Sequence, residues 1–417
     1  MRKKISYGRW AYYSTRSLLR RFGLKRPPPP RPANLKIFTN IQTAAVAGIT
    51  RVMSSFGDYI SASAPNAELV CCTMAAEPYL DAPVWSELSG GERGMRTLLY
   101  GRPLPNFGGA VKGAADMREL EAAYAGVIEA FRLKLKEECP DVVLVNGTYA
   151  VPWCLMLAAH SLQLPVMLYY HGSLTKETEH WKEAGAREIL RKVEASFDRR
   201  RVKYIFPSIL VKDFVEQHVY MRRLYRKNVA VLPNPIPEEF FSAESRKSRR
   251  RIGFIGRWTR IKNTAFLERF VELNHKAGKP FDIYVLTDPE SREHAGKRLH
   301  DRVRFVSPRE ESASLAAFYG GMSAIICPSH FETYGNVAQE AVASGTPAYV
   351  SRNMGVSEVF ERAGLGHLIV DFEKPRAVFE ALQNDADLEI PMDARRALRE
   401  EAGAEVVHRK LLEYIRA

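Results

Sequence analysis

Residues 324–347 read AIICPSHFETYGNVAQEAVASGTP, and the order of residue types in this stretch decides the fold class. Residues 324–327 are a short apolar run typical of a strand, residues 328–335 form a polar loop, and a helix is predicted to start near residue 336. Residues 345–347 then separate that helix from the next apolar run. A strand followed by a helix and another strand is the repeating unit of a parallel sheet.

The same alternation extends in both directions from this stretch. We predict strands at residues 35–41, 68–73, 142–146, 166–170, 204–207, 229–232, 252–255, 283–286, 303–306, 324–327, 348–350 and 368–370. Apolar residues recur at helical spacing over residues 117–135 and again over 394–415, and each range is predicted to be one helix. The pattern predicts an α/β protein with two doubly wound parallel sheets that face a cleft, where a ligand would bind.

The length of 417 residues favours two domains of roughly 200 residues each, because one hydrophobic core rarely grows larger. We expect an N-terminal domain over residues 34–236, a C-terminal domain over 237–393 and a C-terminal helix over 394–417. Residues 1–33 are a basic segment that ends in a proline run and contains no acidic residue. A short helix on an anionic membrane surface and a solvated basic tail are both open interpretations of it.

The composition points to a globular chain with an anionic partner. Hydrophobic residues make up 46% and charged residues 26%, but the formal net charge is +13. This charge favours a nucleotide, an acidic membrane surface or nucleic acid, and cannot choose among them alone. The basic clusters at residues 199–203, 222–227 and 246–251 contain one aromatic residue, Tyr225, too few for a stacking platform. We therefore expect no nucleic acid partner and favour an anionic membrane surface.

Cysteine usage and hydropathy bear on the compartment. The five cysteines form no CxxC pair, which favours reduced thiols in a cytoplasmic protein. Polar residues and prolines interrupt the most apolar region, residues 142–170, so no membrane span is expected there. The N-terminus lacks the apolar core of a secretory signal. We expect a cytoplasmic protein, with peripheral contact to the inner face of the plasma membrane as a further hypothesis.

Cations surround the predicted turn after the strand at residues 252–255, where the chain reads GRWTRIKN over residues 256–263. Such a turn lies at the carboxyl edge of an open sheet, and the next helix offers free amides to an anion. Arg257 presents a planar fork and Lys262 a compact charge, so together they suit a diphosphate and can replace a divalent metal. Solvated surface charges are the alternative.

Two carboxylates mark the predicted loop and helix start of residues 328–341. Asn336 and Gln339 resemble a capping box, which places Glu332 in the loop and Glu340 near the first turn of the helix. Carboxylates accept hydrogen bonds from sugar and ribose hydroxyls, and Gly335 lets the backbone approach a ligand closely. For Glu340, a favourable interaction with the helix dipole is the alternative.

Glu332 and Glu340 are separated by seven residues and resemble the E-x7-E motif of retaining GT-B glycosyltransferases, particularly glycosyltransferase family 4. The turn at residues 256–262 is similar to that family's diphosphate-binding turn. Residues 233–235, Pro-Asn-Pro, resemble its interdomain segment, and residues 345–347 resemble its G-x-P step. The resemblance is specific over residues 231–370 and general over residues 34–230, and it implies the GT-B fold of two Rossmann-like domains.

The resemblance also implies roles for single residues. It assigns donor binding to Arg257, Lys262, Glu340, Gly335, Asn336, Tyr334 and Gly48, and catalysis to Glu332 and His171. In these roles Glu340 holds the ribose, and Glu332 holds the donor sugar with nearby amides. The family retains the anomeric configuration by a same-face displacement in which the departing phosphate helps deprotonate the acceptor, so no protein base is expected.

Two of these assignments depend on segments of the N-terminal half. His171 follows a predicted strand where the family often has a sugar-contacting histidine, and a structural histidine at a strand end is the alternative. The family commonly shows paired glycines after its first strand, whereas this chain has only Gly48, after Ala47, which leaves that contact open.

We expect no metal site and no cofactor apart from a nucleotide diphosphate sugar as co-substrate. Residues 385–387, Asp-Ala-Asp, have the D-x-D spacing of metal-dependent transferases, but they lie in a polar stretch near the C-terminus. The chain contains no H-E-x-x-H spacing and no G-x-S-x-G elbow, so zinc-enzyme and hydrolase functions are set aside.

The sequence predicts a retaining, metal-independent hexosyltransferase that acts on a glycan or lipid-linked acceptor in cell-envelope polysaccharide or glycolipid synthesis. Two alternatives stay open. One is a glycosyltransferase-like protein that binds a nucleotide or glycan without catalysis, and the other is a different GT-B enzyme, such as a phosphorylase or an epimerase.

Overall fold

The computed structural model describes residues 34–41, 48–75, 83–88, 95–242, 250–295, 299, 301–307, 315–385 and 388–417. These residues divide into two compact units. The first consists of the described residues up to Tyr169 together with Trp181–Tyr204 and Tyr414–Ala417. The second consists of Tyr170–His180 and Ile205–Glu413.

An eight-stranded sheet has the order β3-β4-β2-β1-β5-β6-β7-β8. Its strands are β1 (Leu35–Asn40), β2 (Ala67–Met74), β3 (Trp85–Glu87), β4 (Met95–Tyr100), β5 (Val142–Asn146), β6 (Val166–Tyr169), β7 (Val202–Phe206) and β8 (Val229–Val231). The pairs β1 with β2, β1 with β5, β2 with β4 and β5 with β6 are parallel, and β3 with β4 is antiparallel. Every residue of β5 is buried, as expected for a central strand covered on both faces.

The helices before and within this part of the chain are α2 (Gly48–Ser63), α3 (Phe107–Gly113), α4 (Met117–Ala123), α5 (Ala125–Glu138), α6 (Ala150–Ser161), α7 (Leu174–Glu177), α8 (Ala184–Ala195), α9 (Ile209–Phe214) and the one-turn π-helix η1 (Val215–Val219), with the 3-10 turn η2 (Arg226–Asn228). The single helix predicted over residues 117–135 is two helices. The chain leaves helical geometry at Tyr124, whose buried side chain donates a hydrogen bond to the carbonyl of Pro105 at 2.9 Å.

The second sheet is five-stranded, with the order β11-β10-β9-β12-β13 and parallel pairing throughout. Its strands are β9 (Arg251–Ile255), β10 (Asp282–Leu286), β11 (Arg304–Val306), β12 (Ala324–Cys327) and β13 (Ala348–Val350). The strand order reverses between β9 and β12. In sheets of this kind, ligands bind at the carboxyl ends of the two strands that flank such a switch point.

The strand predicted over residues 368–370 is wrong. Residues 366–368 form a 3-10 turn, η4 (Gly366–Leu368), which leaves only a short extended piece beside β13. Ile369 makes a single bridge to Val350, and the amide of Val370 donates to the carbonyl of the same residue at 3.0 Å.

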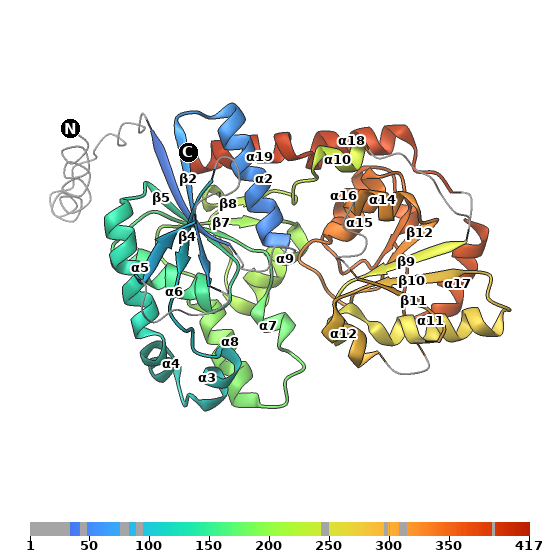
Figure 1. The fold of residues 1–417 in the computed structure, drawn as a ribbon, viewed down its shortest axis with the longest axis horizontal. Helices are drawn as coiled ribbons and strands as arrows, with labels where there is room; N and C mark the ends of the chain where they lie inside the picture. The colour runs from blue at the N-terminus through green and yellow to red at the C-terminus, as the bar shows by residue number, and fades with distance from the viewer. Residues whose placement is uncertain are drawn as a thin grey trace. The chain divides into compact units, whose positions relative to one another are not determined.

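The other helices of this unit are η3 (Arg260–Lys262), α10 (Glu238–Phe241), α11 (Thr264–Lys276), α12 (Pro289–His294), α14 (Leu315–Gly320), α15 (Asn336–Ala343), α16 (Val356–Arg362), α17 (Pro375–Asn384), α18 (Met392–Ala402) and α19 (Ala404–Arg416). In Figure 1, α11 and α17 lie side by side, and Phe270 packs on Phe379 with ring centroids 5.5 Å apart. Asn263 caps α11, because its side chain accepts a hydrogen bond from the amide of Phe266.

The helix predicted over residues 394–415 is interrupted at Gly403. There the chain pairs with the extended segment at Ile236, which exchanges backbone hydrogen bonds with Ala402 and Ala404 at 2.8 and 3.0 Å. A Cβ atom at Gly403 would lie 2.5 Å from the carbonyl oxygen of Arg399, so only glycine fits this break. Among the helices of the described residues, none has both the length and the apolarity needed to cross a membrane.

Candidate functional site

The turn after β9 brings Lys262 back over the strand end. Gly256 has a φ of 153°, and its amide donates to the carbonyl of Leu286 at 3.1 Å. A Cβ atom at Gly256 would lie 3.8 Å from Cδ and Cε of Lys262. The Lys262 stem therefore lies against the turn at ordinary contact distance, and it is the positive φ that favours glycine at residue 256.

An ion pair joins this turn to the loop after β12. Nζ of Lys262 donates to Oε1 of Glu332, and Oγ of Ser329 donates to the same carboxylate oxygen at 2.8 Å. Burial raises the pKa of Cys327, at the end of β12, and the negative charge of Glu332 raises it further. Both members of the pair are partly exposed, with 26% of the Lys262 and 19% of the Glu332 side chain accessible.

Arg257 lies exposed at the same turn. Burial alone would raise the pKa of nearby Asp288, but hydrogen bonds from the amide and hydroxyl of Ser291 and the positive charge of Arg257 lower it overall. Ser291 also accepts a hydrogen bond from the amide of Trp258 at 2.9 Å. The turn after β9 is thus fixed to α12, while the guanidinium group of Arg257 is accessible to solvent.

Backbone hydrogen bonds hold the loop that carries Glu332. The amide of Glu332 donates to the carbonyl of Asn353, and the amide of Gly355 donates to the carbonyl of Glu332, both at 3.1 Å. Gly335 has a φ of 125°, and a Cβ atom there would lie 2.8 Å from Cε of Met354 and 3.0 Å from Cγ1 of Val356. Glycine is therefore required at residue 335 by both conformation and space.

The capping box predicted at Asn336 and Gln339 is wrong. Gly335 is the N-cap of α15, and no side chain caps that helix. Both side chains bind Asn234 instead. Nδ2 of Asn234 donates to Oδ1 of Asn336 at 2.8 Å, and Nε2 of Gln339 donates to the carbonyl of Asn234 at 3.1 Å. These bonds tie α15 to the Pro-Asn-Pro segment.

Glu340 has different partners from Glu332. It lies in the second turn of α15, its side chain is buried, and the hydroxyl group of Tyr319 donates to Oε2 at 2.9 Å. This bond orients the carboxylate without neutralising its charge. The structure thus brings Lys262, Glu332 and Gly335 together. Glu340 makes a separate hydrogen bond, with Tyr319.

His171 follows β6, as predicted, and its carbonyl accepts a hydrogen bond from Oγ1 of Thr333 at 2.8 Å. This bond places His171 beside the loop that carries Glu332. Burial lowers the pKa of its half-buried imidazole to about 3, so the ring is neutral at physiological pH.

The remaining predicted residues lie in different settings. The ring of Tyr334 is buried in the core of the second sheet, and its carbonyl accepts from the amide of Val356 at 2.9 Å. Gly48 is the first residue of α2, in the first unit. Asp385 accepts a hydrogen bond from the hydroxyl of Tyr349 at 2.6 Å. The rest of the D-x-D motif, residues 42–47 of the first loop and the basic segment 1–33 lie outside the described residues.

Sequence reasoning did not identify Ser208, Ser329 and Thr333. Oγ of Ser208 donates to the carbonyl of Thr333 at 2.8 Å, and a Cβ atom at Gly355 would lie within 2.5 Å of both residues. The spacing of Ser329 three residues before Glu332 was the available signal for that contact. The contact of Ser208 joins residues 125 positions apart, and no local pattern reveals it.

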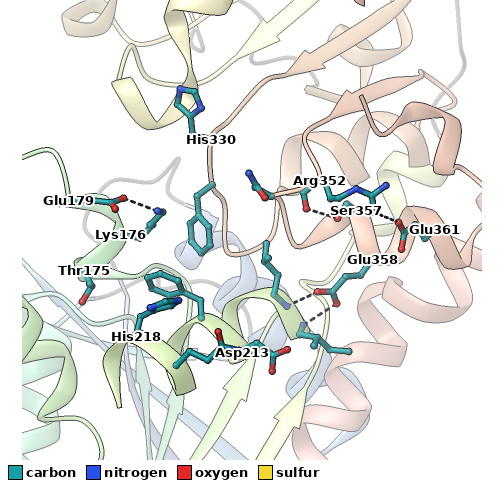
Figure 2. A pocket seen from close by; sticks show the side chains of 16 residues that line it. Thr175, Lys176, Glu179, Asp213, His218, His330, Arg352, Ser357, Glu358 and Glu361 are labelled. Atoms are coloured by element: carbon teal, nitrogen blue, oxygen red, sulfur yellow. Dashed lines mark hydrogen bonds and ion pairs between the residues drawn. The ribbon is translucent and has the colours of Figure 1, made fainter. Parts of the chain in front are cut away.

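A cavity of about 780 Å³ adjoins this loop (Figure 2). It is lined by Thr175, Lys176, Glu179, Ile209, Leu210, Asp213, Phe214, Gln217, His218, His330, Phe331, Arg352, Asn353, Ser357, Glu358 and Glu361. All of these residues belong to the second unit. No sequence motif indicated this cavity, because its walls come from four separate segments.

Comparisons with known proteins agree with this architecture. Residues 110–240 match the model of Glycosyltransferase Family 4, and residues 249–384 match the model of Glycosyl transferases group 1. A D-inositol 3-phosphate glycosyltransferase from Corynebacterium kroppenstedtii is 30% identical over 181 residues, which are 38% of this chain and 40% of the relative. The enzyme of the same name from Corynebacterium glutamicum is 36% identical over 96 residues, 22% of each protein. The matches thus span less than half of these curated relatives.

The solved structure of sucrose-phosphate synthase from Thermosynechococcus elongatus superposes with a TM-score of 0.70 at 18% identity. The superposition covers 92% of this chain and 98% of that structure, so the likeness concerns the fold of nearly the whole molecule. Two family models, two sheets of the expected topology and this structural neighbour lead to the same assignment. The chain is a GT-B-fold glycosyltransferase homologue that resembles glycosyltransferase family 4.

Proposed function

We propose that this protein transfers a sugar from a nucleotide diphosphate sugar to a glycan or lipid-linked acceptor, with retention of anomeric configuration and without a metal ion. The observation that carries the proposal is the ion pair of Lys262 and Glu332 at the switch point of the second sheet. In this pair, a cation suited to phosphate is in direct contact with a carboxylate suited to sugar hydroxyls. In this proposal residues 237–393 are the donor domain and residues 34–236 the acceptor domain.

The diphosphate binds Arg257, Lys262 and the free amides at the start of α15, around Gly335 and Asn336. Helix N-termini and paired cations both favour a phosphate group. Lys262 is held by Glu332 in the free protein, so the phosphate competes with that carboxylate when the donor arrives. The backbone at Tyr334 adds to the donor contacts, and the contact of Gly48 stays a prediction from the family resemblance.

The carboxylates bind the two sugars of the donor. Glu340 accepts hydrogen bonds from the ribose hydroxyls, with one of its oxygens already oriented by Tyr319. Glu332 accepts hydrogen bonds from the transferred sugar. His171 contacts the transferred sugar, and because its ring is neutral it adds no charge to the site.

In the transfer step, the bond from C1 of the sugar to the phosphate oxygen breaks while the acceptor oxygen bonds to C1 on the same face. The acceptor proton passes to the departing phosphate. Arg257 and Lys262 stabilise the charge that develops on the diphosphate, which is the role a divalent metal has in other transferases. Positioning of the two substrates supplies the remaining rate enhancement.

A lipid-linked acceptor at the inner face of the plasma membrane, in cell-envelope polysaccharide or glycolipid synthesis, fits the surface chemistry. Met221 and Tyr225 are 73% and 71% exposed; Met221 directly precedes the basic cluster of residues 222–227, and Tyr225 lies within it. Exposed apolar side chains within a basic segment are typical of surfaces that contact anionic lipid. Together with the net charge of +13, this segment favours peripheral membrane contact.

The proposal is tested by incubating the protein with UDP, GDP and ADP sugars in EDTA and measuring release of the nucleoside diphosphate, with and without lipid-linked and free glycans. We expect release from one nucleotide class and strong stimulation by an acceptor. The variant Lys262→Ala should abolish release of the nucleoside diphosphate. Formation of a sugar 1-phosphate from a glycan and inorganic phosphate, without any nucleotide sugar, would identify a phosphorylase. Isomerised donor without release of the nucleoside diphosphate would identify an epimerase. Donor binding with no turnover would favour the non-catalytic alternative.

A further inference from the structure

The cavity beside the Glu332 loop has an aromatic surface. Phe331 packs on Phe214 with ring centroids 5.3 Å apart, and the ring of His218 lies 5.0 Å from that of Phe214. Nζ of Lys176 is 5.9 Å from the Phe214 centroid and 5.8 Å from that of Phe331. The three rings therefore form one aromatic cluster beside the Lys176 ammonium group, and we call this cluster the Phe214 platform.

The charged groups around this platform neutralise one another. Lys176 pairs with Glu179 at 2.7 Å, and Arg352 pairs with Glu361 at 2.9 Å. Figure 2 places the first pair on the left of the cavity and the second on the right. A further carboxylate, Glu358, accepts hydrogen bonds from the amides at the start of α9, at 3.0 Å and 2.6 Å.

The cavity wall therefore offers no surplus of positive charge to a ligand. Its four carboxylates, Glu179, Asp213, Glu358 and Glu361, outnumber its two full cations, although the chain as a whole is strongly basic. Each cation already has a carboxylate partner. A phosphate or sulfate group would have to displace one of these carboxylates and would meet the field of the others.

Further polar side chains line the cavity. His218, Gln217 and His330 are exposed at the cavity, and within the described part of the chain their side chains make no hydrogen bond. Imidazole and amide groups each offer a donor and an acceptor, which matches the paired donor and acceptor character of a hydroxyl group. Aromatic rings flanked by such planar polar groups suit a ring with C–H bonds on its faces and hydroxyls at its edge.

The cavity is also joined to the proposed catalytic loop. Phe331 immediately precedes Glu332, and the carbonyl of Asn353, a cavity residue, accepts the hydrogen bond from the amide of Glu332. A ligand on the Phe214 platform therefore lies against the same backbone that positions the carboxylate proposed to hold the donor sugar. The volume of about 780 Å³ is within the range of small-ligand sites.

We infer that this cavity binds a neutral sugar residue of the acceptor, stacked on the Phe214 platform and hydrogen-bonded by His218, Gln217 and His330. The inference rests on the proposed transferase function and deepens it by naming the acceptor class at this position. The names of the curated relatives indicate a phosphorylated inositol in those proteins. The charge balance of this cavity instead selects an uncharged, hydroxyl-rich group.

The test is a printed array of neutral oligosaccharides and their phosphorylated or carboxylated counterparts, probed with the full-length chain. Phe214→Ala and His218→Ala remove the platform and one hydrogen-bonding ring, and His367→Ala, an exposed histidine away from the cavity, is the matched control. We expect neutral glycans to be bound in preference, with each cavity variant weakening binding about 10-fold or more and the control leaving it unchanged.

Calorimetric titration of the same variants with the nucleotide sugar separates the two claims. A donor affinity that is retained in Phe214→Ala and His218→Ala, with loss of glycan binding, supports the inference. Donor binding without any neutral-glycan binding, or glycan binding that is unaffected by both variants, overturns the inference and leaves the transferase proposal in place. Preference for the phosphorylated glycans also overturns it. Glycan binding without binding of any donor would instead contradict the transferase proposal.

Discussion

The ammonium group of Lys262 pairs with the carboxylate of Glu332, 70 residues further along the chain, so one ion pair joins the turn after β9 to the loop after β12. Ser329 donates to the same carboxylate oxygen. The lysine that is proposed to bind phosphate is therefore already occupied in the free protein. Donor binding must exchange a carboxylate partner for a phosphate partner.

This exchange predicts opposite effects for the two residues on binding of a free nucleoside diphosphate. Glu332→Gln releases Lys262, so affinity should rise about two- to fivefold, the range expected for a partly exposed pair. Lys262→Ala should lower affinity about 10-fold or more, because a charge-assisted phosphate contact is lost. Calorimetry with the three nucleoside diphosphates measures both. A loss of affinity in Glu332→Gln comparable to that in Lys262→Ala would mean that the carboxylate positions the lysine instead of competing for it.

Glu340 is predicted to recognise the ribose of the donor nucleotide. Its carboxylate is buried and oriented by the hydroxyl of Tyr319, so a ribose hydroxyl that donates to it gains a charge-assisted bond in a dry setting. Wild-type protein should bind the ribonucleotide about 10-fold or more tightly than its 2′,3′-dideoxy analogue. Glu340→Gln should largely remove that difference while keeping the melting temperature. Equal discrimination in both proteins would exclude ribose recognition by Glu340.

Gly335→Ala should be more damaging than the same change at another left-handed glycine. Gly335 and Gly364 have φ angles of 125° and 75°, but of these two only Gly335 has neighbouring atoms within 3.0 Å of the position that an alanine Cβ would take. Gly364→Ala should cost about 1 kcal/mol of unfolding free energy from backbone conformation alone. Gly335→Ala should cost about 1–3 kcal/mol more and should also reduce donor affinity. Urea unfolding of both variants makes the comparison, and equal costs would remove the steric argument.

The lowered pKa values of two histidines predict how the free energy of unfolding depends on pH. Burial lowers the pKa of His171 and of His408 to about 3, whereas an unfolded histidine titrates near pH 6.5. As pH falls below 6.5, the unfolded chain takes up protons that the folded chain does not, so the free energy of unfolding falls from about pH 6.5 toward pH 3. His408→Gln should reduce that slope by about 1.4 kcal/mol per pH unit. Urea unfolding between pH 4 and 8 tests this, and an unchanged slope would contradict a neutral buried His408.

Membrane contact is predicted to depend on the segment of residues 221–227. Replacing Met221 and Tyr225 together by Asp should weaken binding to vesicles with anionic lipid about 10-fold, because two exposed apolar contacts are lost and two negative charges are added. Sedimentation with anionic and zwitterionic vesicles measures the effect. Deletion of residues 1–33 separates the contribution of the basic tail, and unchanged binding in both variants would remove the membrane proposal.

Local patterns predicted the parallel strands well, and they failed where distant residues decide the structure. The strand β4 was not predicted, and its second residue, Arg96, is charged. In the fold that guanidinium group pairs with Glu138, 42 residues away, which makes a charged residue compatible with a buried strand. Gly403 divides the C-terminal helices for a similar reason, since its partner segment at Ile236 lies far earlier in the chain.

In the candidate site, too, local sequence patterns predicted some residues, while contacts between distant residues decided others. Arg257, Lys262 and Glu332 could be identified from the sequence because polar residues after apolar strands lie at the carboxyl edge of a sheet. The role of Asn336 could not, since the side chain that binds it, Asn234, is 102 residues away and displaces the expected capping box. The cavity of the Phe214 platform was equally inaccessible to sequence reasoning, because its rings come from separate elements.

The most direct test is calorimetric titration of the purified protein with UDP, GDP and ADP sugars in EDTA, with Lys262→Ala and Glu340→Ala as comparison variants. We expect selective binding of one nucleotide class without metal, and loss of that binding in both variants. Absence of binding to every donor, with or without magnesium, would contradict the account of a nucleotide-sugar site at the switch point of the second sheet.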